Sequence, residues 1–420
     1  MQEALLQYIW KHSLFTTKIY KADTGESVII ENTGSYNTDG GPDFSNARIL
    51  IDNTLWAGNI EIHLKTSDWS KHGHQRNAAY NNVILHVSNL IDSECKTAND
   101  RRVPCIELKY DNTIEDKYSA LLKEDKIISC YKSLPKLDTS LISFWLSALS
   151  VERLLEKTAI IKELLDFTKN HWEEAFYIHL AKSFGLKVNS VPMELLAKST
   201  PLKILARHSS NLFQLEALIF GQAGFLTENA SDEYQASLKK EYEYLSNKYQ
   251  LKKIDQHLWQ FLRLRPANFP TVRLAEFCSL INKSKGLLSL TFDCESLKDL
   301  QKLFRSEPGE YWKTHYVFGK ATKFSKKSLG LRSINSFIIN TVLPFMFTYA
   351  RLKNIDDLQE KSLAFLEQIP PEENHIIEEW KNVGIHSKSA VESQAILQLT
   401  TKYCKSKRCL DCQIGTLILR

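Results

Sequence analysis

The sequence has no long apolar run. None of its 420 residues belong to a stretch that approaches the roughly 20 apolar residues of a membrane-spanning helix. The nearest candidate, residues 337–350, is shorter and contains Asn340 and Pro344. The N-terminus, MQEALLQYIWKHSLF, lacks the basic segment and the small-residue cleavage site of a signal peptide. These absences argue against a membrane or secreted protein, and we expect a cytoplasmic one.

Cysteine is also scarce, with eight residues in the whole chain. That number is too small for a disulfide scaffold. Three of the eight gather near the C-terminus, as Cys404, Cys409 and Cys412. In a reducing compartment, such a trio indicates a metal site more than a set of bridges. It can hold one tetrahedral ion or three corners of an iron–sulfur cluster, although it can equally be partly buried and metal-free.

No strong excess of one charge is present. Lys and Arg total 54 and Asp and Glu total 49, which gives a net charge of +5. A mildly basic chain permits a nucleic-acid partner without requiring one, because binding of a polyanion depends on how charges cluster. A hydrophobic content of 43% is typical of a globular protein with a sizeable core. The composition leaves the oligomeric state open.

Hydrophobic periodicity divides the chain into two parts. The first part predicts a helix, three strands, a helix and a strand, followed by an edge strand, at residues 3–11, 27–31, 45–51, 55–65, 67–80, 83–87 and 102–110. After about residue 115, apolar residues recur three and four apart, as in helices at 141–167, 171–184, 192–208, 211–225, 231–249, 270–283, 296–303, 331–350, 354–368 and 374–383. We therefore predict an α+β protein, with a domain containing a mixed sheet at 1–115 and a mostly helical domain at 116–420 that carries the cysteine trio.

Two carboxylates lie in the predicted sheet. Asp43 follows Pro42 at the start of a strand, and Glu61 lies on the next strand, within the sequence EIHLK. Because side chains alternate along a strand, Glu61, His63 and Lys65 share one face. If the two carboxylates converge, a divalent cation relieves their repulsion. In the opposing interpretation, Asp43 is a turn residue and Glu61 faces solvent.

This order of elements, with Pro-Asp before one strand and Glu on the next, resembles the PD-(D/E)XK restriction-endonuclease-like superfamily. The resemblance implies a nuclease in which Asp43 and Glu61 bind Mg²⁺ or Mn²⁺ and Glu3 assists as a further acidic ligand. The superfamily has lysine two positions after the glutamate, where this chain has His63. His63 or Lys65 would then position the attacking water and help to deprotonate it.

Two further histidines follow closely, His72 and His74. We expect them to contact phosphate or to cap the adjacent helix. A zinc site is the alternative, and it would need a further ligand such as His86 or Asp68. Since His86 lies within the apolar run VILHV, it fits a core position better.

The helical part contains one arginine-rich loop, RLRPANFPTVR. Its arginines, Arg263, Arg265 and Arg273, can bind the phosphates of a nucleic acid together with a helix N-terminus. Alternatively, the loop is an interdomain corner that arginine–carboxylate pairs hold in place.

A fourth cysteine ligand is implied by the same superfamily. Several of its nucleases hold a four-iron–four-sulfur cluster with one distant cysteine and three C-terminal ones. In this chain, Cys130 matches the distant position, with Cys404, Cys409 and Cys412 as the other three. Zinc remains the alternative metal for this set.

The chain as a whole resembles a bacterial family known as domain of unknown function 2851. The resemblance rests on motifs spread over nearly the full length: GPDFSNARI, GNIEIHLKTSDWSKHGH, FGQAGFL, RLRPANFPTVRLA and CLDCQIG. It implies a bacterial origin and no particular activity.

The leading hypothesis from the sequence is a metal-dependent nuclease that cleaves DNA or RNA. A second hypothesis is a nucleic-acid-binding protein that keeps the fold without catalysis. A third is a structural or protein-interaction role.

Overall fold

The computed structural model describes residues 2–420. It divides into two compact units, which we call unit 1 (Met1–Trp145 with Leu399–Arg420) and unit 2 (Leu146–Gln398). The predicted boundary near residue 115 differs from this division in two ways. The segment up to Trp145 belongs with the sheet, and so does the C-terminal end of the chain.

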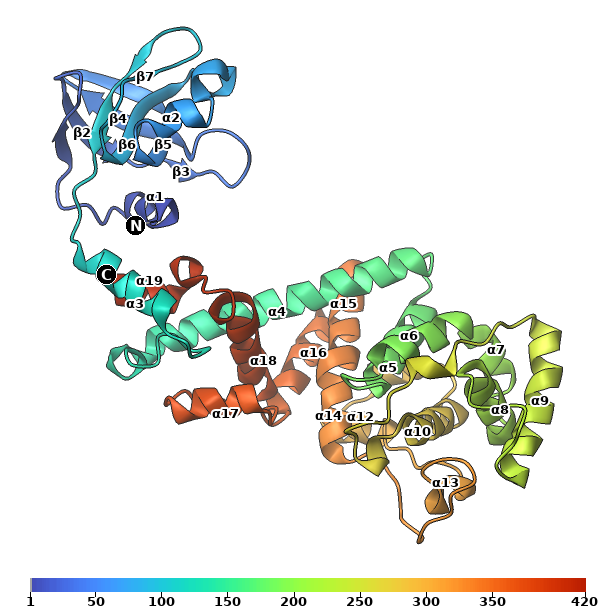
Figure 1. Ribbon diagram of the computed structural model, residues 1–420. Helices are drawn as coiled ribbons and strands as arrows, with labels where there is room; N and C mark the ends of the chain where they lie inside the picture. Colours follow the sequence, from blue (N-terminus) through green and yellow to red (C-terminus); the bar gives the residue numbers. More distant parts are fainter. Residues whose placement is uncertain (1) are drawn as a thin grey trace. The chain divides into compact units, whose positions relative to one another are not determined.

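Unit 1 is built on a seven-stranded mixed sheet (Figure 1). Its strand order is β1-β2-β4-β5-β6-β9, with β3 paired to β4. Strands β1, β2, β4 and β5 are antiparallel, whereas β6 is parallel to β5 and β9 is parallel to β6. The predicted α+β class is confirmed. The elements of the N-terminal part are α1 (Glu3–Lys11), β1 (Ile19–Lys21), β2 (Ser27–Asn32), β3 (Ser35–Tyr36), β4 (Phe44–Ile51), β5 (Thr54–Lys65), α2 (Asp68–Lys71), β6 (Val83–Leu90), β7 (Cys95–Lys96), β8 (Arg102–Val103), β9 (Cys105–Glu107) and α3 (Thr113–Lys123).

The β4–β5 hairpin fixes the register of the two strands that bear the carboxylates. Its turn is Asp52-Asn53, between the paired residues Ile51 and Thr54, and Asp52 takes a φ of 52°. Positive φ is what a two-residue hairpin turn requires. Further along, β4 contains a bulge at Asn46, which has a φ of 56°. Since a bulge re-aims the neighbouring side chains, this one helps to set the direction of the chain just after Asp43.

The helix in the crossover from β5 to β6 is shorter than the sequence predicts. We expected a helix from residue 67 to about 80, but α2 ends at Lys71. Gly73 then takes a left-handed φ of 78°, and two short 3₁₀ turns follow, His74–Arg76 and Ala78–Tyr80. A residue in this conformation ends a helix and redirects the chain.

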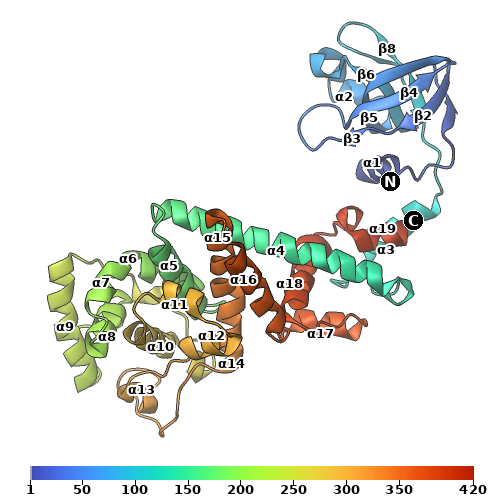
Figure 2. The same cartoon turned by 180° about the vertical axis from the view of Figure 1, so that it is seen from behind.

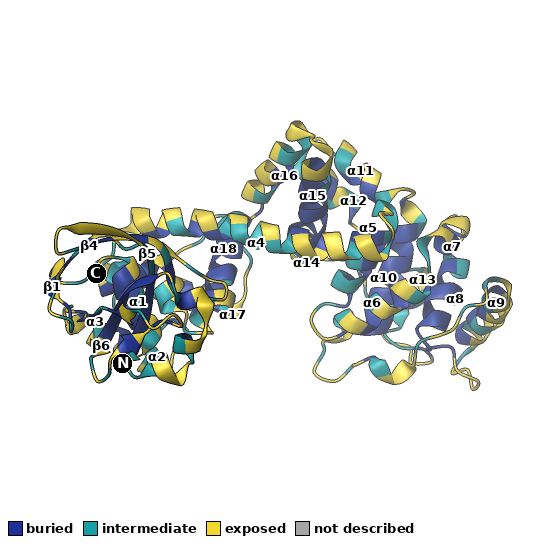
Figure 3. Ribbon diagram, turned by 90° about the horizontal axis from the view of Figure 1, so that it is seen from above, coloured by how far each residue is buried: buried dark blue, intermediate teal, exposed yellow. Residues whose placement is uncertain are grey.

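The core of unit 1 joins the first helix, the sheet and the C-terminus (Figure 3). Helix α1 buries Leu5 and Ile9 against the sheet residues Ile60 and Ile62. The same cluster contains residues of α3 and, from the last helix α19 (Gln413–Leu419), Leu419. Helices α3 and α19 pack together (Figure 1). The shared core explains why the C-terminal residues belong to unit 1.

Unit 2 is helical (Figure 2). Helix α4 (Thr139–Phe167) carries the chain from unit 1 into it. The predicted helix 192–208 is split in two, because Pro201 lies between α6 and α7 and cannot donate an internal hydrogen bond. Within residues 2–420, no helix combines the length and the apolar character needed to cross a membrane. The other helices are α5 (Trp172–Phe184), α6 (Ser190–Ser199), α7 (Leu202–Arg207), α8 (Leu212–Gln222), α9 (Glu233–Tyr249), α10 (Pro270–Lys283), α11 (Leu287–Asp293), α12 (Leu297–Leu303), α13 (Glu310–Thr314), α14 (Leu331–Phe337), α15 (Leu343–Lys353), α16 (Asp356–Gln368), α17 (His375–Asn382) and α18 (Ala390–Gln398).

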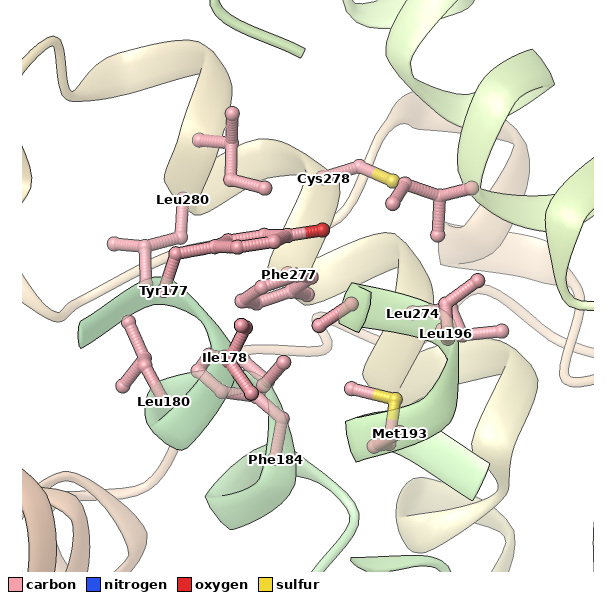
Figure 4. Packing of buried hydrophobic residues seen from close by; sticks show 14 of the residues in the cluster. Tyr177, Ile178, Leu180, Phe184, Met193, Leu196, Leu274, Phe277, Cys278 and Leu280 are labelled. Carbon is pink, nitrogen blue, oxygen red and sulfur yellow. The ribbon is translucent and has the colours of Figure 1, made fainter. Parts of the chain in front are cut away.

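Aromatic packing between α5 and α10 forms the centre of unit 2 (Figure 4). The rings of Tyr177 and Phe277 stack with their centroids 5.8 Å apart. The Tyr177 hydroxyl donates a hydrogen bond of 3.0 Å to the Thr200 carbonyl oxygen, so its polar end is satisfied. Met193 of α6 and Cys278 of α10 belong to the same apolar cluster. Cys278 is therefore a core residue of this unit.

One buried carboxyl in unit 2 makes its stability depend on pH. Glu216 is 0% exposed and accepts a hydrogen bond from the Tyr234 hydroxyl. Burial raises the pKa of Glu216 to about 7. The pKa of Glu216 is higher in the folded state than in the unfolded state. Protonated Glu216 therefore contributes its full stabilisation at pH values below the pKa of the unfolded state. That contribution is lost as the pH rises through the folded value.

We therefore expect Glu216→Gln, which imitates the protonated acid, to change the free energy of unfolding little at pH 4.5. At pH 8, the free energy of unfolding of Glu216→Gln should exceed that of the wild-type protein by about 2–3 kcal/mol. Urea unfolding at the two pH values measures this, with the exposed Glu228→Gln as control. An equal difference between Glu216→Gln and wild type at both pH values would contradict it.

Candidate metal centre

Asp43 and Glu61 lie side by side in unit 1. The backbone N–H of Asp43 donates a hydrogen bond of 3.1 Å to Glu61 Oε2. In return, Asp43 Oδ2 accepts a hydrogen bond of 2.9 Å from the N–H of Ile62. The loop before β4 is thereby attached to the middle of β5, and the two carboxylates lie close together. Glu61 is only 5% exposed, which excludes the interpretation that it faces solvent.

Burial and neighbouring charges act on the acidic groups of this site. Burial, followed by the charge of Glu61, raises the pKa of Asp43 to about 7. Glu3, on α1, is close enough for its charge to act on both. Burial also raises the pKa of Glu3. Converging acidic groups with raised pKa values are typical of a site that binds a cation.

Gln7 is a member of the site that the sequence did not lead us to predict. Its side-chain Nε2 donates a hydrogen bond of 2.9 Å to Asp43 Oδ1. Glu3 and Gln7 are four residues apart on α1 and so share one face of the helix. That spacing is the signal that could have identified Gln7.

Three histidines meet beside Glu61. His63 Nε2 lies 3.1 Å from His72 Nδ1 and 3.4 Å from Glu61 Oε1. His74 Nε2 lies 3.2 Å from the same Glu61 oxygen. One nitrogen from each of the three rings falls within 4.8 Å of the others. The alternative of a zinc site grouped His72 and His74 with His86 or Asp68, whereas in the structure the third ring is that of His63.

The ring of His63 is also tied to the sheet behind it. His63 Nδ1 lies 2.9 Å from His86 Nε2, and His86 Nδ1 lies 3.1 Å from Cys95 Sγ. Cys105 Sγ lies 3.8 Å from the same His86 nitrogen. Burial lowers the pKa of His63 and that of His86 to about 3. Both rings are thus neutral near pH 7, and His86 is the core histidine that its apolar neighbours predict.

Lys65 does not join this group. It lies exposed at the end of β5, where its backbone N–H donates to Asp68 Oδ2. Its charge acts on Asp92, which is also at the surface. Strand alternation places Lys65 on the face of Glu61 and His63, but its side chain is exposed. Of the two residues predicted to position water, only His63 is buried beside Glu61.

The four predicted cysteine ligands come together elsewhere in unit 1. Cys130 follows α3, Cys404 ends a π-helical turn, Cys409 begins a 3₁₀ turn, and Cys412 precedes α19. All four line one cavity of about 20 Å³. Lys407 joins the two segments, because its ammonium group donates hydrogen bonds to Ser129 Oγ and to the Glu124 carbonyl oxygen.

The thiols of this quartet are largely buried, and burial raises their pKa values. Burial, with the charges of Cys412 and Cys409, raises the pKa of Cys130 to about 12. Burial raises the pKa of Cys409 to about 11. A bound metal ion reverses this effect and deprotonates a coordinating thiol. Across residues 2–420, two groups of three or more ligand atoms lie within 4.8 Å of one another, and neither contains a cysteine of this quartet.

The predicted arginine group is divided in unit 2. Arg273 is 7% exposed. Its guanidinium lies 2.8 Å from a Glu276 oxygen and donates to Asn268 Oδ1 at 2.6 Å. The arginine–carboxylate pair lies within α10, and the bond to Asn268 ties the loop to that helix inside unit 2, whereas the alternative expected an interdomain corner. Arg263 and Arg265 are exposed and remain candidates for phosphate binding.

Comparison with known proteins identifies the family. A family model described as "Protein of unknown function (DUF2851)" matches residues 3–375. The chain belongs to the DUF2851 family. Both carboxylates and the three histidines lie inside the matched region, whereas Cys404, Cys409 and Cys412 follow its end. Searches of curated proteins and of solved structures gave no match.

Proposed function

We propose that unit 1 is a metal-dependent phosphodiesterase that acts on nucleic acid. The observation that carries this proposal is the pairing of Asp43 with the buried Glu61 through the Asp43 N–H. The sheet supports it as well. An antiparallel β2–β4–β5 meander, preceded by α1 and followed by the parallel strand β6, has the order of the restriction-endonuclease-like core.

A divalent ion at these carboxylates, Mg²⁺ or Mn²⁺ in the superfamily, would activate water and neutralise the leaving oxygen. Asp43 and Glu61 would hold the ion, and Glu3 would add negative charge at the edge of the pocket. Gln7 fixes the orientation of Asp43 through its hydrogen bond to Oδ1. His63 stands where the superfamily has lysine, so it is the residue that would orient the water.

Nucleic acid is the proposed substrate because the resemblance is to nucleases. Arg263 and Arg265 of unit 2 are exposed and could bind phosphate groups. Salt-dependent binding is the expected signature, since each neutralised phosphate releases counterions.

We further propose that the cysteine quartet holds a structural metal centre. A zinc ion with sulfur ligands at about 2.3 Å brings the four sulfur atoms close to one another. In an iron–sulfur cluster, the cysteines bind different corners and stay further apart. The quartet offers four sulfur ligands to either metal. Visible absorption of freshly purified protein, together with metal analysis, distinguishes the two.

A catalytically inactive nucleic-acid-binding protein is the second candidate. It is favoured by His63 in the lysine position and by Lys65 at the exposed end of β5. Salt-sensitive binding without turnover in any divalent metal would support it.

Cleavage of labelled DNA and RNA by the full chain tests the leading proposal. We expect cleavage in Mg²⁺ or Mn²⁺, none in chelator, and a loss of at least about a hundredfold in Asp43→Ala. Asp39→Ala is a matched control, because Asp39 is exposed on the same loop. Metal-dependent cleavage that is unchanged in Asp43→Ala would overturn the assignment.

A further inference from the structure

The histidines beside Glu61 supply nitrogen ligands to a pocket whose other members are carboxylates. His63 and His74 are 1% and 7% exposed, whereas His72 is at the surface. His63 lies on β5, His72 is the residue that ends α2, and His74 begins the 3₁₀ turn that follows. Because Gly73 separates His72 from His74 with a left-handed φ of 78°, two residues that are close in sequence direct their rings to one point.

Aromatic neighbours hold the ring of His74 in place, but its Nε2 atom has no hydrogen-bond partner. Tyr80 stacks on the ring with the centroids 3.8 Å apart, and Trp69 packs edge-on against it. His74 Nε2 is buried and has no hydrogen-bond partner. It approaches Glu61 Oε1 to 3.2 Å without the angle of a hydrogen bond. A buried polar atom without a partner is costly, and a cation between this nitrogen and the carboxylate would remove the cost.

The hydrogen bonds that link His63 to His86 and Cys95 allow a tautomer of His63 in which Nε2 carries no hydrogen. Cys95 Sγ lies 3.5 Å from the Thr66 carbonyl oxygen and can donate to it. The sulfur then accepts from His86 Nδ1–H, and His86 Nε2 accepts from His63 Nδ1–H. A neutral imidazole carries one N–H, so His63 Nε2 directs a lone pair into the pocket. A backing of this kind is what orients a metal-binding histidine.

The two oxygen atoms of Glu61 contact different residues. Its Oε2 accepts the Asp43 N–H, whereas Oε1 is the oxygen that lies near His63 and His74. The three imidazole nitrogens thus lie within 4.8 Å of one another, and Glu61 Oε1 lies within 3.4 Å of two of them.

We infer that His63, His72, His74 and Glu61 form a binding site for a first-row transition-metal ion such as zinc. Three imidazoles and one carboxylate are a donor set that suits zinc and its neighbours. Magnesium, in contrast, prefers oxygen ligands and water. The inference deepens the proposed function, since it names the class of ion that the phosphodiesterase would use, although ion binding can be measured without cleavage. In this arrangement His86 is a positioning residue.

Equilibrium dialysis with metal analysis, on full-length metal-free protein, tests this site. We expect His72→Ala and His74→Ala each to lose about one bound zinc ion per chain, or to bind it at least about a hundredfold more weakly. Magnesium in large excess should not displace the zinc. His257→Ala is the control, because His257 is exposed in unit 2. Cys412→Ser identifies the metal held by the cysteines, and its loss should add to that of His72→Ala.

Cobalt substitution provides an independent readout. The visible spectrum of the Co²⁺ form should lose a nitrogen–oxygen component in His72→Ala and a sulfur component in Cys412→Ser. Circular dichroism verifies the fold, and if His74→Ala does not fold, then His72→Ala decides because its side chain is exposed. Wild-type zinc stoichiometry and affinity in His72→Ala would overturn the inference. Zinc binding without any cleavage would support the site and contradict the proposed function, and magnesium-dependent cleavage with no zinc at the histidines would do the reverse.

Discussion

Replacing Glu61 with glutamine is expected to lower cleavage by about a thousandfold or more. Glu61 is shared by the carboxylate pair and the histidine group, so one substitution removes charge from both. Glutamine can still accept the hydrogen bond from Asp43 N–H, but its amide nitrogen would face His63 and His74 and could not bind a cation. The fold should therefore persist while metal binding is lost.

Rates of cleavage and zinc stoichiometry measure this result on the same preparation. Thermal unfolding should give a midpoint within a few degrees of wild type, because the side-chain volume and one hydrogen bond remain. Glu31→Gln, at an exposed position on β2, controls for the change of charge. If Glu61→Gln cleaves at the wild-type rate, neither the carboxylate pair nor the histidine group can be the catalytic centre.

The strands around this pocket were predictable because local rules determine them. The turn at Asp52-Asn53 and the alternation along β5 are properties of neighbouring residues, and they place Glu61 and His63 on one face. The approach of Asp43 to Glu61 followed from the hairpin register. For these residues, the sequence predicted the elements, and it gave the convergence of the two carboxylates as one of two interpretations.

The meeting of the histidines could not be predicted in the same way. It depends on α2 ending after Lys71 and on the left-handed conformation of Gly73, whereas helix periodicity predicts a continuous helix over the same residues. Lys65 shows the converse limit. Alternation gives its face correctly, but only the packed structure shows that its side chain is exposed.

The sequence predicted that the C-terminal cysteines lie near Cys130, but it assigned the C-terminal residues to the helical domain. A resemblance to cluster-binding nucleases paired Cys130 with the C-terminal trio, and the four residues do line one cavity. The predicted domains nevertheless assigned the chain from residue 399 onward to the helical part, since periodicity cannot reveal which core a helix joins. Leu419 packs with the sheet of unit 1, so unit 2 is an insertion between two parts of unit 1.

Cys130→Ser is expected to destabilise unit 1. The proposed metal would connect the part of unit 1 that precedes the insertion with the part that follows it. Cys130 lies before unit 2 and the other three lie after it, so a shared metal would hold the two parts of unit 1 together. A structural metal site contributes on the order of 10 kcal/mol of binding free energy, and this energy is also folding energy. Cys130→Ser should therefore lose the metal and lower the unfolding midpoint of unit 1 by about 10 °C or more.

Limited proteolysis adds a local readout, because the C-terminal segment should become accessible while unit 2 stays protected. Cys294→Ser is the matched control, since Cys294 lies in unit 2 and outside the quartet. If the four thiols hold no metal, Cys130→Ser replaces one half-buried group with a similar one and costs about 1 kcal/mol. A Cys130→Ser protein with wild-type metal content and an unchanged midpoint would thus show that the convergence of the four cysteines is packing alone.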